Sequence, residues 1–359
     1  MTREMSLYLD LIRFLAALVV VVVHSYGMGM TGGFLWQLAE HGQTAVMVFF
    51  VLSGYVISFV SSTKEKNIVD YSYARLSRLY SVVVPALIIT ILCNEIGSFY
   101  IKEEYTGPWD NSQNYEYLRY VLTFFMLQDL WGLGLSPANN LPFWSISFEV
   151  VYYVMFALLF YVRALITKIF FIVMIAILSG PTVVALFPIW LLGWCAYKAH
   201  SRSGFLIKGG VCYILFFGGM ILLIFSPMVR GFLSFDIEYI DRKSLGGDYV
   251  DALAFFVHLL SAPFVIVKVK NFLFKFKKEI IFLGGLTFPL YLFHLPLVRF
   301  FAGVSPFISE PSSVLNRLFV FIGLFSIVCL FGLPCDKFKR YLNKLLRACV
   351  CRFSLLARA

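Results

Sequence analysis

The sequence predicts an all-α membrane protein with about ten transmembrane helices, and three observations support this fold class. Hydrophobic residues make up 60% of the 359 residues and charged residues only 14%. Apolar runs of roughly twenty residues, the length that crosses a bilayer as a helix, recur along the chain. Basic residues are concentrated in the short segments between these runs. A chain that crosses lipid in this way must satisfy its backbone hydrogen bonds inside each segment, and a helix does so.

The apolar runs give the predicted helices in order. The first is retained rather than removed as a signal peptide, because it carries Asp10, Arg13 and His24 and no small-residue cleavage site follows it. The predicted spans are 6–28, 42–61, 80–98, 143–162, 168–187, 188–199, 207–226, 249–267, 279–303 and 314–334.

The distribution of Lys and Arg predicts the orientation of these spans. Basic clusters lie at 64–78, 163–168, 198–208, 268–278 and 337–358. The excess of basic over acidic residues gives the chain a net charge of +10. Placing all five clusters in the cytoplasm, as the positive-inside rule requires, puts both termini there. The charge then reflects topology, and no nucleic-acid partner is predicted. Residues 1–335 are expected to form a membrane domain and residues 336–359 a basic cytoplasmic tail.

Residues 118–134 do not fit this alternation. The segment is apolar enough to span, yet counting it as a span would place the later basic clusters outside. We expect a re-entrant half-helix on the outer side, buried by protein or lining a wet cavity. A short additional helix is the alternative.

Arg13 and His24 are the first candidate site residues. Eleven residues separate them on one helix, so they lie on nearly the same face, about 16 Å apart along the axis. Burying an arginine in a membrane helix is costly, which favours a functional reason for keeping it. Alternatively, Arg13 extends to the near surface and His24 is satisfied at the far one.

Two arginines precede the third span. Arg75 and Arg78 fall on one helical face at the membrane interface, and their guanidinium groups suit a phosphate-rich ligand. Ordinary positive-inside charge is the alternative. In the second span Ser53 precedes Gly54, and this glycine is more typical of close helix packing than of catalysis.

An acidic residue, Glu149, lies about two turns into the fourth span. Its expected depth matches that of His24, so its carboxylate is predicted to fix the imidazole tautomer. Trp144 begins this span and is either a site residue or an interface anchor. In the ninth span, Tyr291 and His294 lie between Pro289 and Pro296, which should free backbone groups toward a cavity.

These motifs in order, Arg13 with His24, GQTAVMVFFVLSGY, RLSRLY, FWSISFE and YLFH, resemble acyltransferase family 3. This is a family of bacterial inner-membrane O-acyltransferases that modify O-antigen, exopolysaccharide and related glycans. The resemblance implies an acyl-CoA donor, most simply acetyl-CoA, on the cytoplasmic side and a glycan or lipid-linked sugar acceptor. Five histidines without metal-ligand spacing predict no metal, and no phosphate-binding glycine loop is present.

The resemblance also implies roles for the candidate residues. Arg75, Arg78 and Arg13 would hold the CoA phosphates, and His24 would act as a general base or, alternatively, as an acylated nucleophile. Glu149 would orient His24, and either Tyr291 or backbone N–H groups would steady the oxyanion. The residues expected to contact substrate are Trp144, Ser145, Tyr291, His294 and Ser53. A transporter or flippase for a lipid-linked sugar is the competing hypothesis, against which the two halves show no matching broken segments.

Overall fold

The computed structural model describes residues 1–100, 115–202, 209–235 and 237–356. In this part of the chain all regular structure is helical, apart from one isolated bridge between Ile237 and Ile240. The predicted all-α class is therefore confirmed. The long helices are α1 (Arg3–Ser25), α3 (Gly42–Thr63), α4 (Ile68–Tyr100), α7 (Trp144–Tyr161), α8 (Leu165–Ser179), α9 (Pro181–Ser201), α10 (Gly210–Ile224), α12 (Leu245–Ile266), α14 (Lys277–Gly303) and α15 (Val314–Leu356).

Each predicted span overlaps one of these ten helices, and the protein is a multi-pass membrane protein. Eight of the described helices are long and apolar enough to cross a bilayer. A ninth forms if α10 and α11 (Ser226–Phe232), which meet at a 65° bend, count as one span. With only 15 residues, α8 is shorter than a full crossing.

Two predicted boundaries are wrong. The break expected between residues 187 and 188 lies at Gly180, whose φ of 90° suits glycine and ends α8, so Pro188 lies inside α9. A Cβ at Gly180 would also meet the Trp131 backbone at 2.9 Å. The predicted start of the third span is residue 80, but its helix α4 begins at Ile68, so the RLSR segment before the predicted span is part of the same helix.

The segment 118–134 is a short helix followed by irregular chain. Helix α6 (Glu116–Phe124) has nine residues and is about 13 Å long, less than half a membrane crossing. The chain then turns through positive φ angles at Met126 and Trp131. Two side chains fix this backbone: the Gln128 amide donates to the Phe143 carbonyl (2.6 Å) and the Trp131 indole to that of Ile177 (2.9 Å). Helix α6 is too short to cross a bilayer, and its re-entrant placement on the outer side stays a prediction.

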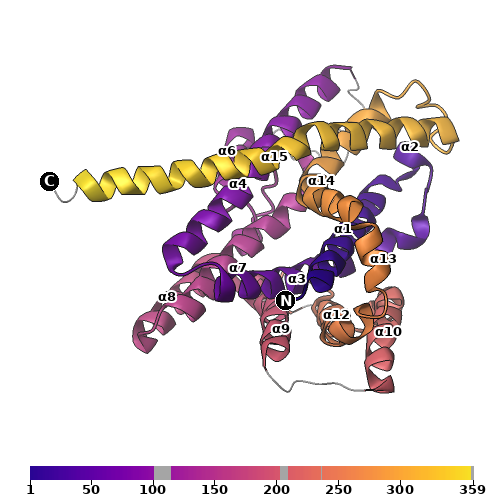
Figure 1. Ribbon diagram of the computed structural model, residues 1–359. Helices are drawn as coiled ribbons and strands as arrows, with labels where there is room; N and C mark the ends of the chain where they lie inside the picture. Colours follow the sequence, from indigo (N-terminus) through magenta and orange to yellow (C-terminus); the bar gives the residue numbers. More distant parts are fainter. Residues whose placement is uncertain (101–114, 203–208, 236, 357–359) are drawn as a thin grey trace.

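The site is built around α1, α3 and α14 at the centre of the bundle. Helix α1 packs on α14 and α3, while α4 and α15 pack on α14 from one side and α9 and α12 pack on α3 from the other (Figure 1). Close approach of α3 to α9 requires glycine on both helices: a Cβ at Gly54 would be 2.0 Å from the Trp190 oxygen. Gly54 thus serves helix packing.

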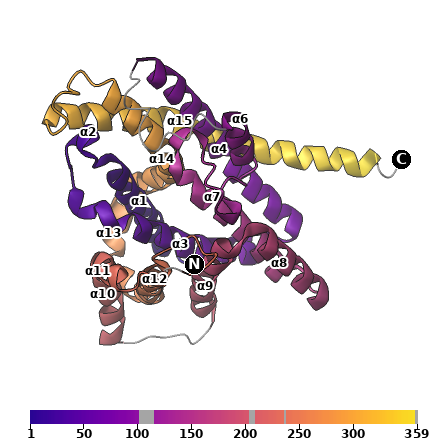
Figure 2. The same ribbon diagram turned by 180° about the vertical axis from the view of Figure 1, so that it is seen from behind.

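The last helix is longer than the predicted tenth span. Helix α15 continues through residues 335 and 336, where the predicted tail begins, and it extends beyond the body of the molecule toward the C-terminus (Figures 1 and 2). On the way it packs along α4, with Arg347 paired to Asp70 at 2.8 Å. The division at residue 335 stays a prediction, but no helix end marks it.

The remaining short elements connect these helices. Between α1 and α3 lie α2 (Met28–Thr31) and η1 (Trp36–His41), and α13 (Lys270–Lys275) precedes α14. Three short helices lead from α6 to α7, namely η2 (Leu130–Gly132), η3 (Pro137–Asn139) and η4 (Leu141–Phe143).

Candidate active site

Two cavities adjoin in the centre of the bundle, and the side chains of Val46 and Tyr291 line both. The first, which we call the arginine cavity, has a volume of about 60 Å³ and contains Arg13 and Arg78. The second, which we call the histidine cavity, has a volume of about 480 Å³ and contains His24. Because α1 supplies both Arg13 and His24, its axis connects the two cavities.

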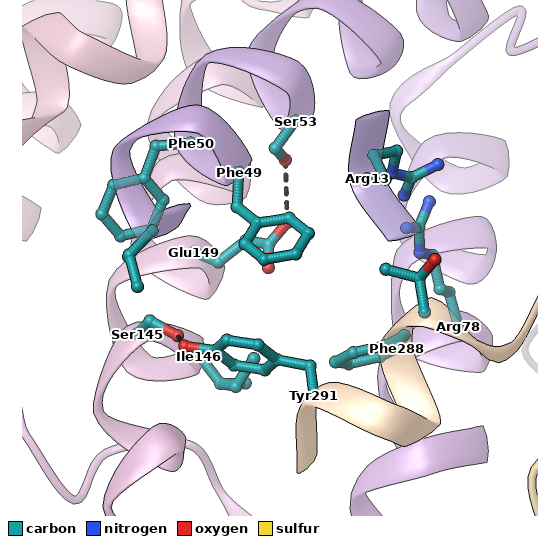
Figure 3. A pocket seen from close by; sticks show the side chains of 12 residues that line it. Arg13, Phe49, Phe50, Ser53, Arg78, Ser145, Ile146, Glu149, Phe288 and Tyr291 are labelled. Atoms are coloured by element: carbon teal, nitrogen blue, oxygen red, sulfur yellow. Dashed lines mark hydrogen bonds between the residues drawn. The ribbon is translucent and has the colours of Figure 1, made fainter. Parts of the chain in front are cut away.

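The arginine cavity brings together cations from two helices. Arg13 of α1 and Arg78 of α4 lie side by side on one wall (Figure 3). The Arg13 Nη1 atom is 3.7 Å from Asp10 Oδ1. Among the described residues the guanidinium of Arg78 has neither an ion pair nor a hydrogen bond. Two neighbouring guanidinium groups with so little compensation form a site suited to an anion.

Glu149 of α7 lies across this cavity from the arginines (Figure 3). Its carboxylate accepts hydrogen bonds from the Ser53 hydroxyl (2.8 Å) and from the Tyr153 hydroxyl. The predicted contact between Glu149 and His24 is wrong, because Glu149 lines the arginine cavity and His24 the histidine cavity. Hydropathy predicted a similar membrane depth for both residues, but it does not predict which way the helix face that carries each residue points.

Arg75 lies apart from Arg78. Its buried guanidinium forms an ion pair with Glu65 and lies 5.0 Å from the centre of the Tyr71 ring. It does not line the arginine cavity. The two arginines that the sequence placed on one face therefore differ in environment, and a role of Arg75 in phosphate binding stays a prediction.

His24 forms a hydrogen bond with His294, which comes from α14. The His294 Nδ1–H donates to the carbonyls of Leu290 (3.1 Å) and Tyr291 (2.8 Å), so its Nε2 carries the lone pair. This Nε2 accepts from His24 Nδ1–H at 2.9 Å. The neutral tautomers are thereby fixed, and His24 Nε2 is left with an unprotonated lone pair. Among the described residues no hydrogen bond to His24 Nε2 is found. A histidine in this state is equipped to act as a base.

The wall between the cavities is held by polar contacts to α14. The Tyr291 hydroxyl lies 2.8 Å from the Ser145 hydroxyl (Figure 3). Since Pro296 has no N–H, the Leu292 carbonyl four residues earlier lacks its helical partner. The buried side chain of Asn140 donates to that carbonyl at 3.0 Å. The sequence predicted the freed carbonyls near the prolines, but not Asn140 as the donor.

Trp144 lines the histidine cavity, and next to it lies a charge network that the sequence analysis missed. The Arg242 guanidinium lies 4.9 Å from the centre of the Trp144 ring and bonds to Asp248 at 2.6 Å. Arg230 of α11 pairs with Asp248 at 2.6 Å and also with Asp251. An acidic residue at position 251, inside a predicted span, was the available signal. This network of two cations and two anions ties the α10–α11 bend to α12.

The chain matches a known family over most of its length. Residues 6–333 match the model of acyltransferase family 3, which is described as an acyltransferase domain. The chain belongs to this family. The family model describes an acyltransferase domain, and the two cavities are the candidate site for that chemistry in this chain. Among the described residues no group of three or more His, Cys, Asp or Glu side chains is placed to hold a metal ion.

Comparison with individual proteins gives a shorter match. An O-acetyl transferase of Shigella phage Sf6 is 34% identical over 82 residues, which cover 23% of this chain and 24% of the phage protein. The aligned region is thus about a quarter of that relative. No solved structure matches the chain.

Proposed function

We propose that this acyltransferase moves an acetyl group from acetyl-CoA to a hydroxyl of a cell-surface carbohydrate, such as O-antigen or exopolysaccharide. The observation that carries the proposal is the pair of adjoining cavities. One presents cations that have little compensation, the other presents the lone pair of a histidine, and Tyr291 lines both. The activity named for the phage relative, O-acetyl transfer, agrees with it.

The arginine cavity is proposed as the donor side. Arg13 and Arg78 would bind the phosphates of CoA, for which guanidinium geometry is well suited. A volume of about 60 Å³ is too small for a nucleotide but admits a narrow chain. The pantetheine arm would therefore enter and carry the thioester toward His24, which lies about 16 Å from Arg13 along α1.

The histidine cavity is proposed as the acceptor side. Its volume of about 480 Å³ falls in the range of small-molecule sites. The Trp144 ring supplies an apolar surface, and Glu40, Gln43 and Ser244 supply groups that can hydrogen-bond to sugar hydroxyls. Because the arginines beside this cavity are paired with aspartates, the charge that remains on its wall is the carboxylate of Glu40. An uncharged acceptor group suits it.

In the proposed reaction, His24 Nε2 removes the proton of the acceptor hydroxyl while the hydroxyl oxygen attacks the thioester carbonyl. The tetrahedral intermediate collapses by breaking the carbon–sulfur bond, and the CoA thiolate takes the proton from the imidazolium. His294 holds the ring of His24 in the required tautomer. The Tyr291 hydroxyl would donate to the oxyanion, which its position at the wall shared by the two cavities supports.

The experiment uses purified protein in lipid nanodiscs with acetyl-CoA and a candidate glycan. We expect release of free thiol that depends on the glycan, and a new acetyl ester in the NMR spectrum of the product. A transporter or flippase for a lipid-linked sugar would release no thiol. That outcome would overturn the proposal.

We further propose that the chain lies in the bacterial cytoplasmic membrane with both termini inside, where acyl-CoA is made. Single cysteines introduced at the exposed positions Glu310 and Lys66, after replacement of the seven native cysteines, test the orientation. A membrane-impermeant thiol reagent added outside should label position 310. Labelling of position 66 from outside would reverse the topology.

A further inference from the structure

We infer that Lys339, in the cytoplasmic extension of α15, completes the donor site by binding the 3′-phosphate of CoA. This inference rests on the proposed function and extends it to the nucleotide end of the donor. Lys339 belongs to none of the motifs that point to the family, and it lies beyond the residues that the family model matches.

The packing of α15 against α4 places Lys339 beside Arg78. The two helices run antiparallel, since Arg347 pairs with Asp70 at 2.8 Å and the Asn343 amide donates to the Ser77 hydroxyl at 3.3 Å. Residues 347, 343 and 339 follow at intervals of four on one face of α15. Continuing the register by one turn therefore brings Lys339 to the Arg78–Ser81 turn of α4.

A contact with α14 supports the same position. One turn before Lys339, Asp336 lies against Gly285, where a Cβ would be 3.8 Å from its Oδ2 atom. The neighbouring Gly284 contacts Asp10, which precedes Arg13 by one turn of α1. Lys339 thus lies close to the place where α1, α4 and α14 meet beside the arginine cavity.

The side chain of Lys339 is available for a ligand. It is partly exposed, and within the described residues it has no hydrogen bond and no ion pair within 4 Å. The carboxylates nearby are Asp336 and Asp10, of which Asp10 is 3.7 Å from Arg13. Lys339 does not line the arginine cavity, so it would bind a phosphate that stays outside this cavity. In CoA, the 3′-phosphate is separated by a ribose from the diphosphate that the arginines would hold.

The donor series acetyl-CoA and acetyl-dephospho-CoA, which differ only in the 3′-phosphate, tests this inference. Loss of a charge-assisted hydrogen bond should raise the KM of Lys339→Gln for acetyl-CoA about tenfold, with kcat little changed. Its KM for acetyl-dephospho-CoA should equal that of the wild type, and Lys339→Arg should retain most of the preference. The matched control is Lys337→Gln, which removes an exposed lysine from nearly the opposite face of the same helix.

Three outcomes would overturn the inference. One is a Lys339→Gln variant that behaves like Lys337→Gln, and another is an equal rise of KM for both donors. The third needs no variant: a wild-type protein that uses both donors equally well has no 3′-phosphate site. Failure of the wild type to release thiol from either donor would instead contradict the proposed function, so the two failures can be told apart.

Discussion

A pair of arginines lies at each of the two cavities, but the two pairs differ in whether carboxylates neutralise them. Beside the histidine cavity, Arg230 and Arg242 are bound to Asp248 and Asp251, whose side chains are 0% and 1% exposed. In the arginine cavity, Arg13 has one carboxylate at 3.7 Å and Arg78 has no close partner among the described residues. Pairing offsets the cost of burying a charge, whereas partly buried charges without close partners cost free energy unless a ligand compensates them. The difference supports the arginine cavity as the proposed anion site.

The largest expected effect concerns His24, which lines the histidine cavity and belongs to neither arginine pair. His24→Ala should reduce acyl transfer about 100- to 10,000-fold, as removal of a general base does, while the protein accumulates normally. The measurement is glycan-dependent thiol release at equal protein concentration. A variant that keeps more than a tenth of wild-type activity would exclude the role of base.

The next effect is one of stability. Arg230→Ala leaves the buried carboxylate of Asp251 without its cation, while Asp248 keeps Arg242, so the substitution should lower the free energy of unfolding by about 3–5 kcal/mol. A thermal unfolding series in detergent measures this loss. Arg78→Ala is the matched control on the other cavity and should unfold at or above the wild-type temperature. Equal destabilisation by the two substitutions would contradict the difference between the paired and the unpaired arginines.

A smaller effect is expected on donor binding. Arg78→Ala should raise the KM for acetyl-CoA about tenfold with less effect on the acceptor, because a charge-assisted contact with phosphate is lost. Arg78→Lys should rescue only in part, since lysine lacks the guanidinium fork. Steady-state kinetics with each substrate varied in turn decide the matter. An equal loss for both substrates would point to a structural role.

The smallest expected effect separates Glu149 from the histidine pair. Glu149→Gln keeps size and hydrogen-bonding capacity but removes the charge opposite the arginines, and we expect a fall in turnover of up to about tenfold. Because Glu149 does not contact the histidines, its loss should multiply with that of His294→Gln. The losses of His24→Ala and His294→Gln should not multiply, since these residues act as a unit. The kinetics of the two double variants test this. The separation would be contradicted if the losses of Glu149→Gln and His294→Gln did not multiply while those of His24→Ala and His294→Gln did.

The sequence by itself determined the class of the molecule and the depth of its polar residues. Hydropathy and the cost of exposing backbone in lipid predicted the ten long helices, because both act within a single segment. Helical periodicity placed Arg13 and His24 on one face of α1, and both line cavities. The prolines of α14 indicated free carbonyls, and one of them receives the Asn140 amide.

Only the tertiary structure decided which of these residues meet. His24 pairs with His294, 270 residues away, and Glu149 pairs with Ser53, 96 residues away. Arg75 turns to Glu65 while Arg78, three residues on, faces the cavity. The position of Lys339 beside Arg78 likewise depends on the packing of α15 along α4. The physical reason is that burial in a membrane fixes how deep a side chain lies, whereas the rotation of each helix is set by its packing against its neighbours.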